Sequence, residues 1–153
     1  MNTSPASQTT PVALPRVALL LGYGGLLPFV ALAAALPWLQ GAAHDRAQSA
    51  LLLYGAVIVS FLGAVHWGSA LARHDTASAP WLWGVLPALL AWVAASLPFA
   101  WAAAALALSL AACWLADRQL LRGPAWAAYL RLRTVLTGVA MLALLAAAAQ
   151  AVR

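Results

Sequence analysis

The chain has 153 residues, of which 65% are hydrophobic and only 7% are charged. Soluble proteins carry about a quarter charged residues, so this composition excludes a soluble globular protein and predicts an integral membrane protein. The net charge of +5 comes from arginines in the predicted loops or at the ends of predicted spans, where membrane topology explains them. Nucleic acid is therefore not an expected partner, and the lipid bilayer is.

Residues 1–15 are polar, contain proline and show no periodicity, so we expect a disordered N-terminal segment. The remainder, residues 16–153, predicts one domain of the all-α class, a bundle of five transmembrane helices. The first span follows Arg16, and its apolar run is longer than that of a usual signal peptide. The expected spans are about 17–39, 47–71, 81–97, 99–116 and 131–152.

Prolines predict where the spans bend or turn. Pro28 removes a backbone donor inside the first span and should kink it. Pro98 predicts a tight turn, so that the third and fourth spans form an antiparallel hairpin. A charged loop is expected from Asp117 to Gly123, with Asp117 paired to a nearby arginine or to one of the last helix. Pro124 suits a helix first turn and predicts where the last helix begins.

Arginine distribution predicts the orientation. Five spans place the N-terminus, the 72–80 loop and the 117–133 region on one side of the membrane. By the positive-inside rule the side richer in arginine is cytoplasmic. We therefore expect a multi-pass protein of the bacterial cytoplasmic (inner) membrane, with a cytoplasmic N-terminus and a periplasmic C-terminus. The arginines on the inner side are Arg16, Arg73, Arg118, Arg122, Arg131 and Arg133, against Arg46 and Arg153 on the outer side.

Helix breakers and polar side chains of four spans reach the cytoplasmic half. On a helical wheel the second span gathers Gly55, Val59, Gly63, His66 and Ala70 on one face. Gly63 should lie at a close helix crossing, against the kinked first span near Gly25 and Pro28. The candidate residues for a pocket or for packing are Pro28, Ser60, Gly63, His66, Trp67, Pro87, Arg131, Arg133 and Thr137.

His66 carries the strongest functional signal, because a histidine in lipid needs partners for its donor and its acceptor. The second span contains no carboxylate around it, so we expect a neutral imidazole at pH 7. Two interpretations stay open: a structural histidine of the core, or a group that handles protons or a ligand. The expected partners of the imidazole are Ser60, Tyr23, Thr134 and Thr137.

Metal, haem and catalytic chemistry are not expected. His44 and His74 do not stand at ligand spacing from His66, so the metal prediction is none. No nucleophile, base and orienting group occur together, which predicts a protein that is not an enzyme and holds no cofactor. The two arginines of the last span, Arg131 and Arg133, are interpreted as topology determinants or lipid headgroup contacts.

Four motifs carry a resemblance that covers about residues 17 to 140. The most specific is the second, in which serine, glycine, histidine, tryptophan and glycine follow one another inside an apolar run. The set resembles the family known as domain of unknown function 3429, which includes the mitochondrial transmembrane protein 69. The resemblance implies a small polytopic membrane protein and supplies no activity. The motifs are GYGGLLPF (22–29), YGAVIVSFLGAVHWG (54–68), WLWGVLPALLAW (81–92) and PAWAAYLRLRTVLT (124–137).

The function predicted from these features is that of a non-catalytic scaffold or accessory to other membrane proteins. Its expected partners are other membrane proteins or further copies of the same chain, in addition to lipid. The alternative is a transporter-like protein that binds a small ligand or a proton in a cytoplasm-facing pocket around His66.

Overall fold

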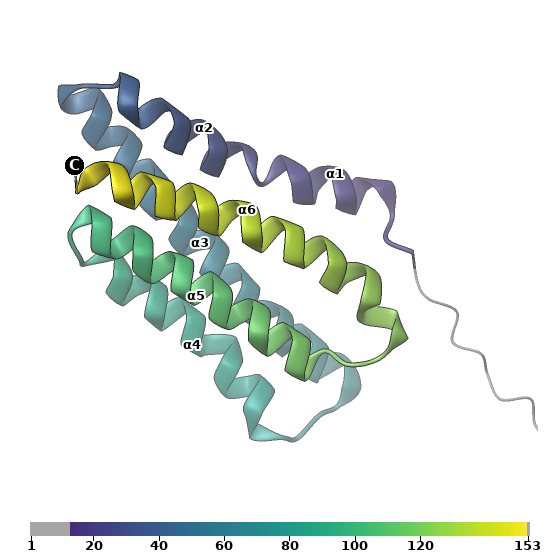
Figure 1. Ribbon diagram of the computed structural model, residues 1–153. Helices are drawn as coiled ribbons and strands as arrows, with labels where there is room; N and C mark the ends of the chain where they lie inside the picture. The colour runs from purple at the N-terminus through teal and green to yellow at the C-terminus, as the bar shows by residue number, and fades with distance from the viewer. Residues whose placement is uncertain (1–12, 153) are drawn as a thin grey trace, which may run out of the picture.

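A computed structural model describes residues 13–152, and within that range every regular element is helical. Five of its helical segments are long and apolar enough to cross a membrane, which confirms the predicted fold class (Figure 1). Most of the disordered segment predicted over residues 1–15 lies outside the described residues. The elements are α1 (Arg16–Gly24), α2 (Leu27–Ala35), η1 (Leu36–Trp38), α3 (Gly41–Arg73), α4 (Ser78–Ala95), α5 (Phe99–Leu120), η2 (Pro124–Trp126) and α6 (Ala127–Ala151).

The first span is broken into α1 and α2 at Gly25 and Leu26. Pro28 stands in the first turn of α2, where it cannot donate to the carbonyl four residues earlier. The Tyr54 hydroxyl of α3 donates to the carbonyl of Gly25, at 2.8 Å, and so satisfies a backbone group at the break. The kink predicted from Pro28 is confirmed.

Two helices are longer than predicted. Helix α3 begins at Gly41 and runs for 33 residues, about 50 Å at 1.5 Å per residue. The segment predicted as a loop before residue 47 is therefore largely helical. Helix α5 ends at Leu120, beyond the predicted end at residue 116. Asp117 is consequently a helical residue, and its assignment to a loop is wrong.

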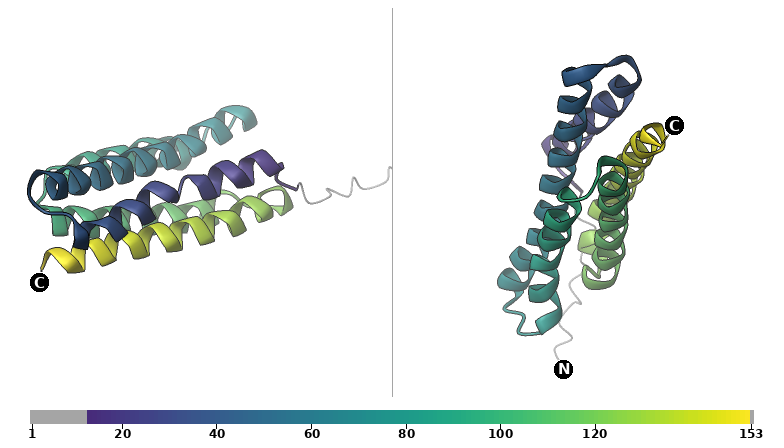
Figure 2. Two further views of the ribbon diagram at one scale, coloured as in Figure 1. Left: turned by 90° about the horizontal axis from the view of Figure 1, so that it is seen from above. Right: turned by 90° about the vertical axis from the view of Figure 1, so that its left-hand side faces the viewer.

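The spans form a closed bundle in which each contacts the next in sequence and α6 returns to the first span. Helix α3 is central, since it also contacts α5, and Figure 2 shows the bundle from above and from the left-hand side of Figure 1. The fully buried core residues include Leu51 and Val59 of α3, Leu106 and Leu110 of α5, and Leu144 of α6. The start of α1 and the end of α6 lie at opposite ends of the bundle (Figure 1).

Gly63 lies at a close helix crossing, as predicted, but the helix it meets is α4 and not the first span. A β-carbon at Gly63 would lie 2.6 Å from the carbonyl oxygen of Gly84 and 3.3 Å from Cδ of Pro87. One turn further along α3, the Trp67 indole covers Gly84 and donates from Nε1 to the carbonyl of Trp81, at 2.7 Å. Gly63, Trp67 and Pro87 thus pack α3 against α4.

Candidate functional site

A buried polar cluster joins α3, α5 and α6. Nε2 of His66 lies 2.9 Å from Oδ1 of Asp117, and Nε of Arg133 donates to Oδ2 of the same carboxylate at 2.8 Å. Nη1 of Arg133 donates to the hydroxyl of Thr137, one turn along α6. Exposed fractions are 1% for His66, 0% for Asp117, 5% for Arg133 and 4% for Thr137. The cluster therefore connects three spans within the core.

Each member of the cluster lies on the face of its helix that is buried in the core. In α5 the buried residues recur at spacings of three and four, which is the spacing of one helix face, and the series ends at Asp117. In α6 the corresponding series begins at Arg133 and Thr137. Helices α3 and α5 end at the same end of the bundle where α6 begins. The polar residues of the three buried faces therefore meet at the same depth in the bundle. The α5 series is Ala103, Leu106, Leu110, Cys113 and Asp117, and the α6 series is Arg133, Thr137, Ala140, Leu144 and Ala147.

The cluster pairs one carboxylate with one guanidinium. An isolated ion in a low-dielectric interior is very costly, whereas a hydrogen-bonded ion pair offsets much of that cost. Asp117 and Arg133 form such a pair, and the imidazole of His66 completes it by donating from Nε2 to the second carboxylate oxygen. With a neutral imidazole the cluster carries no net charge.

These contacts correct three predictions. The partner of His66 is Asp117 and none of the four side chains expected. The premise that no carboxylate lies near His66 is wrong, because α5 supplies one from outside the second span. Arg133 is buried and paired, so it is not a surface topology determinant. The pairing of Asp117 with an arginine of the last helix, one of the alternatives considered, is confirmed.

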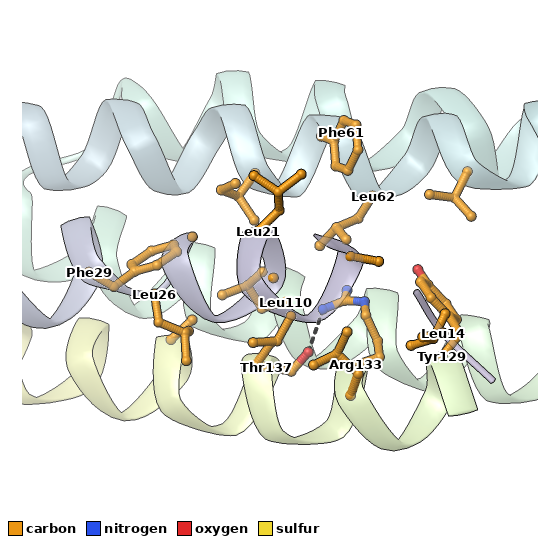
Figure 3. Close-up of a pocket in the computed structure, with 18 residues that line it drawn as sticks. Leu14, Leu21, Leu26, Phe29, Phe61, Leu62, Leu110, Tyr129, Arg133 and Thr137 are labelled. Atoms are coloured by element: carbon orange, nitrogen blue, oxygen red, sulfur yellow. Dashed lines mark hydrogen bonds between the residues drawn. The ribbon is translucent and has the colours of Figure 1, made fainter. Parts of the chain in front are cut away.

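A cavity of about 440 Å³ lies beside the cluster, lined by residues of the first span, α3, α5 and α6 and partly open at the outer surface. Its wall is mostly aliphatic and aromatic, with Tyr129, Arg133 and Thr137 as its polar side chains. Figure 3 shows the Arg133 guanidinium extending from α6 among the apolar lining residues, with its hydrogen bond to Thr137. His66 does not line the cavity and reaches it only through Asp117 and Arg133.

One nitrogen of this guanidinium is unsatisfied. Nε and Nη1 of Arg133 have partners, whereas Nη2 is buried and has no acceptor within 3.5 Å among the residues described, although the hydroxyl of Tyr129 also interacts with the guanidinium. A buried donor without an acceptor costs free energy, about 1–3 kcal/mol, and more when the group is charged. The cavity thus lies beside an arginine that still lacks an acceptor.

Comparison with known proteins places the chain in a family. The profile described as protein of unknown function (DUF3429) matches residues 14–149. The chain belongs to the DUF3429 family. Transmembrane protein 69 of Xenopus tropicalis is 42% identical over 83 residues, which are 52% of this chain and 32% of that relative. The chain thus spans about a third of the length of this relative. No solved structure matches the chain significantly.

The DUF3429 match covers all four residues of the polar cluster. Together with the five spans it confirms the resemblance drawn from the motifs and a multi-pass membrane protein of unassigned activity. Of the residues singled out in the sequence, the structure brings His66, Arg133 and Thr137 together. The structure also places Asp117 in the cluster. Asp117 was not a predicted site residue, and its carboxylate contacts both His66 and Arg133.

Three further candidates in this DUF3429 protein lie apart from the cluster. The Ser60 hydroxyl donates to the carbonyl of Ala56 in its own helix, at 2.8 Å, an ordinary arrangement for serine within a helix. Arg131 is exposed, consistent with a position near lipid headgroups. Pro28 lies at the break of the first span. None of these three residues donates to or accepts from the cluster.

Proposed function

We propose that this protein is a non-catalytic binding protein of the membrane, and that the cavity beside Arg133 holds a small lipophilic molecule. The observation that carries the proposal is a cavity of about 440 Å³ whose few polar groups lie near Arg133. Ligand sites in proteins typically measure about 300–1,000 Å³ and combine apolar walls with a few placed polar groups. This is the ligand-binding alternative, with the polar group at the wall reassigned from His66 to Arg133.

The geometry of the cluster favours ligand binding over catalysis. Both carboxylate oxygens of Asp117 accept hydrogen bonds, and the residue has no exposed surface. A carboxylate in that position holds a guanidinium in place and does not touch a ligand. His66 in turn fixes the carboxylate from the opposite side. The two residues therefore position Arg133, which is the member that reaches the cavity wall.

The setting of the cavity follows from the arginine distribution. We place the protein in the cytoplasmic membrane of a bacterium with its N-terminus inside, because the end of the bundle where α3 and α5 finish is rich in arginine. The cluster and its side of the cavity then belong to the cytoplasmic half of the bilayer.

Gly63 does not support the scaffold hypothesis. A glycine at a helix surface could serve as a contact with a partner protein, but Gly63 packs against α4 of the same chain. Enlarging it would damage the fold whether or not a partner exists. A role as an accessory to other membrane proteins stays a prediction, and ligand binding is the function that we develop.

Photolabelling tests the proposal. The purified protein in non-ionic detergent is incubated with a twelve-carbon alkyl probe that carries a diazirine, irradiated and mapped by mass spectrometry. Leu62 and Leu110 line the cavity and are buried, so their labelling reports occupancy of the cavity. Leu108 is 69% exposed on α5 and reports contact at the outer surface. Labelling confined to outward-facing side chains such as Leu108 would contradict the proposal.

A matched pair of variants on α1 sharpens this result. Ala18 lines the cavity, whereas Leu20, two residues along, is 73% exposed and is not part of its lining. We expect Ala18→Trp to fill the cavity and to abolish labelling of Leu62 and Leu110. Leu20→Trp adds the same ring outside the cavity and should leave that labelling unchanged.

A further inference from the structure

The unsatisfied nitrogen of Arg133 indicates what kind of molecule the cavity takes. We infer that the ligand is an uncharged amphiphile with a single apolar tail, and that an oxygen of its head, such as an ester or ketone carbonyl, accepts a hydrogen bond from Nη2 of Arg133. The inference rests on the proposed function, because it assumes that the cavity is a ligand site. It adds the chemical class of the ligand.

The need for an acceptor comes from the hydrogen bonds of the guanidinium. A guanidinium has five N–H donors and no acceptor. Asp117 and Thr137 take up donors on Nε and Nη1, and Nη2 is buried without a partner among the described residues. Buried polar groups in native proteins nearly always find a partner in protein, water or ligand. An oxygen at the polar end of the cavity would supply the missing acceptor.

The ligand head is uncharged because Asp117 already supplies the carboxylate that pairs with Arg133. The positive charge of Arg133 is matched by Asp117 at 2.8 Å, and no other carboxylate lies on the cavity wall formed by the described residues. Beside a neutral imidazole, placing an anion there would leave one unbalanced negative charge in a low-dielectric interior, which is costly. A carbonyl oxygen satisfies the donor without adding charge. What the site lacks is thus an acceptor and not a countercharge.

The cavity volume sets how much of the tail can be held inside. At about 30 Å³ for each water-sized group, a volume of about 440 Å³ accommodates roughly fifteen such groups, which corresponds to one medium-length chain with its head. Leu21 and Phe61 line the cavity with apolar side chains that are also largely exposed at the outer surface, so the cavity opens toward the bilayer beside them.

Entry from the bilayer follows from the loose packing of the first helix. Helix α1 has no buried residue, although Ala18, Leu21 and Gly22 belong to the cavity wall. Displacing α1 therefore disturbs little of the core, which lies among α3, α5 and α6. A lipophilic molecule can reach Arg133 from the membrane beside α1.

Competition against the photolabel at Leu62 and Leu110 tests the inference in wild-type protein. Four competitors are compared at neutral pH: methyl decanoate, the hydrocarbon undecane, the anion decanoate, and a phosphatidylcholine with two eight-carbon chains. We expect methyl decanoate to compete at least about ten-fold better than undecane, in line with a hydrogen bond to a charged donor. It should also compete better than decanoate.

The phosphatidylcholine distinguishes the two sources of an ester carbonyl. If it competes more weakly than methyl decanoate, the ligand is a free single-chain molecule, as inferred. If it competes better, the site takes a bilayer lipid, and the single-tail part of the inference is overturned.

A second variant locates the acceptor. Arg133→Lys keeps a positive charge opposite Asp117 but lacks the guanidinium nitrogen that is unsatisfied, so the advantage of the ester over undecane should disappear. If this variant does not fold, the competition series in wild-type protein decides alone.

The remaining outcomes separate this inference from the proposed function. Equal competition by methyl decanoate and undecane would overturn the inferred head group while leaving a ligand-binding cavity in place. Stronger competition by decanoate would overturn the charge-balance argument, because an anion would then be preferred. Absence of competition by every compound, together with absence of labelling at Leu62 and Leu110, would overturn the proposed function itself.

Discussion

Replacing Gly63 with alanine tests the most specific packing contact of the bundle. The added β-carbon would lie 2.6 Å from the carbonyl oxygen of Gly84, whereas ordinary contact begins at 3.4 Å. The nearest atoms are the backbone of Gly84 and the ring of Pro87, neither of which can rotate away. Helices α3 and α4 would therefore have to separate by about 0.8 Å, and overpacking of this kind costs about 1–3 kcal/mol.

Gly68→Ala is the matched control on the same helix. A β-carbon at Gly68 would meet nothing within 4 Å. Both substitutions gain the same helix propensity, up to about 1 kcal/mol, so the difference between the two variants isolates the steric cost at Gly63. We expect Gly63→Ala to be less stable than Gly68→Ala by about 1–3 kcal/mol.

The assay is reversible unfolding of the purified protein in mixed micelles, in which the fraction of sodium dodecyl sulfate is raised and helix content is followed by circular dichroism. Gly55→Ala provides an intermediate case, because its β-carbon would lie 3.1 Å from the side-chain atom Cδ1 of Leu106, which can move. Equal stabilities for the variants at Gly63 and Gly68 would refute the close crossing of α3 and α4.

Three further predictions use the same preparation or the intact cell. His66→Gln keeps a hydrogen-bond donor and should preserve folding. His66→Leu leaves the buried carboxylate short of a donor and should lower the free energy of unfolding by about 1–3 kcal/mol in the micelle titration. Equal losses of stability in the two variants would contradict the hydrogen bond. Tyr54→Phe removes the donor to Gly25 and should cost about 0.5–1.5 kcal/mol, while the same change at Tyr23, which is 49% exposed, should cost less. A reporter fused at Gln150 should behave as extracytoplasmic, and an active cytoplasmic reporter there would overturn the orientation.

Span number and the buried face of α3 could be predicted from the sequence because both depend on local patterns. Length and hydrophobicity define a span, and small residues at helical spacing define a face. Gly55, Val59, Gly63, His66 and Ala70 are indeed all buried. The break in the first span could also be predicted from local sequence, because Pro28 lacks a backbone donor.

The helix facing Gly63 could not be predicted, because periodicity defines a face and not its neighbour. The first span and α4 both offered a glycine and a proline at a suitable depth. Only the packing of the bundle decides between them, and it brings Gly84 and Pro87 against Gly63.

Asp117 is not among the predicted site residues, because a charged residue after an apolar run commonly marks the start of a loop. A signal was nevertheless present in the sequence. The series Ala103, Leu106, Leu110 and Cys113 continues to Asp117 at helical spacing, and Arg133 with Thr137 begins the matching series in the last span. The buried faces of these two helices meet at one end of the bundle. A carboxylate on one face and an arginine on the other therefore predict a buried ion pair.

A double-substitution cycle on Asp117 and Arg133 tests the central feature of this account most directly. Replacing either residue alone with leucine leaves one buried charge without its partner, which should cost about 3–5 kcal/mol in the micelle titration. Replacing both removes the two charges together, so the double variant should be more stable than either single variant. If the two single effects simply add in the double variant, Asp117 and Arg133 are not a buried ion pair, and the positioning of Arg133 at the cavity loses its basis.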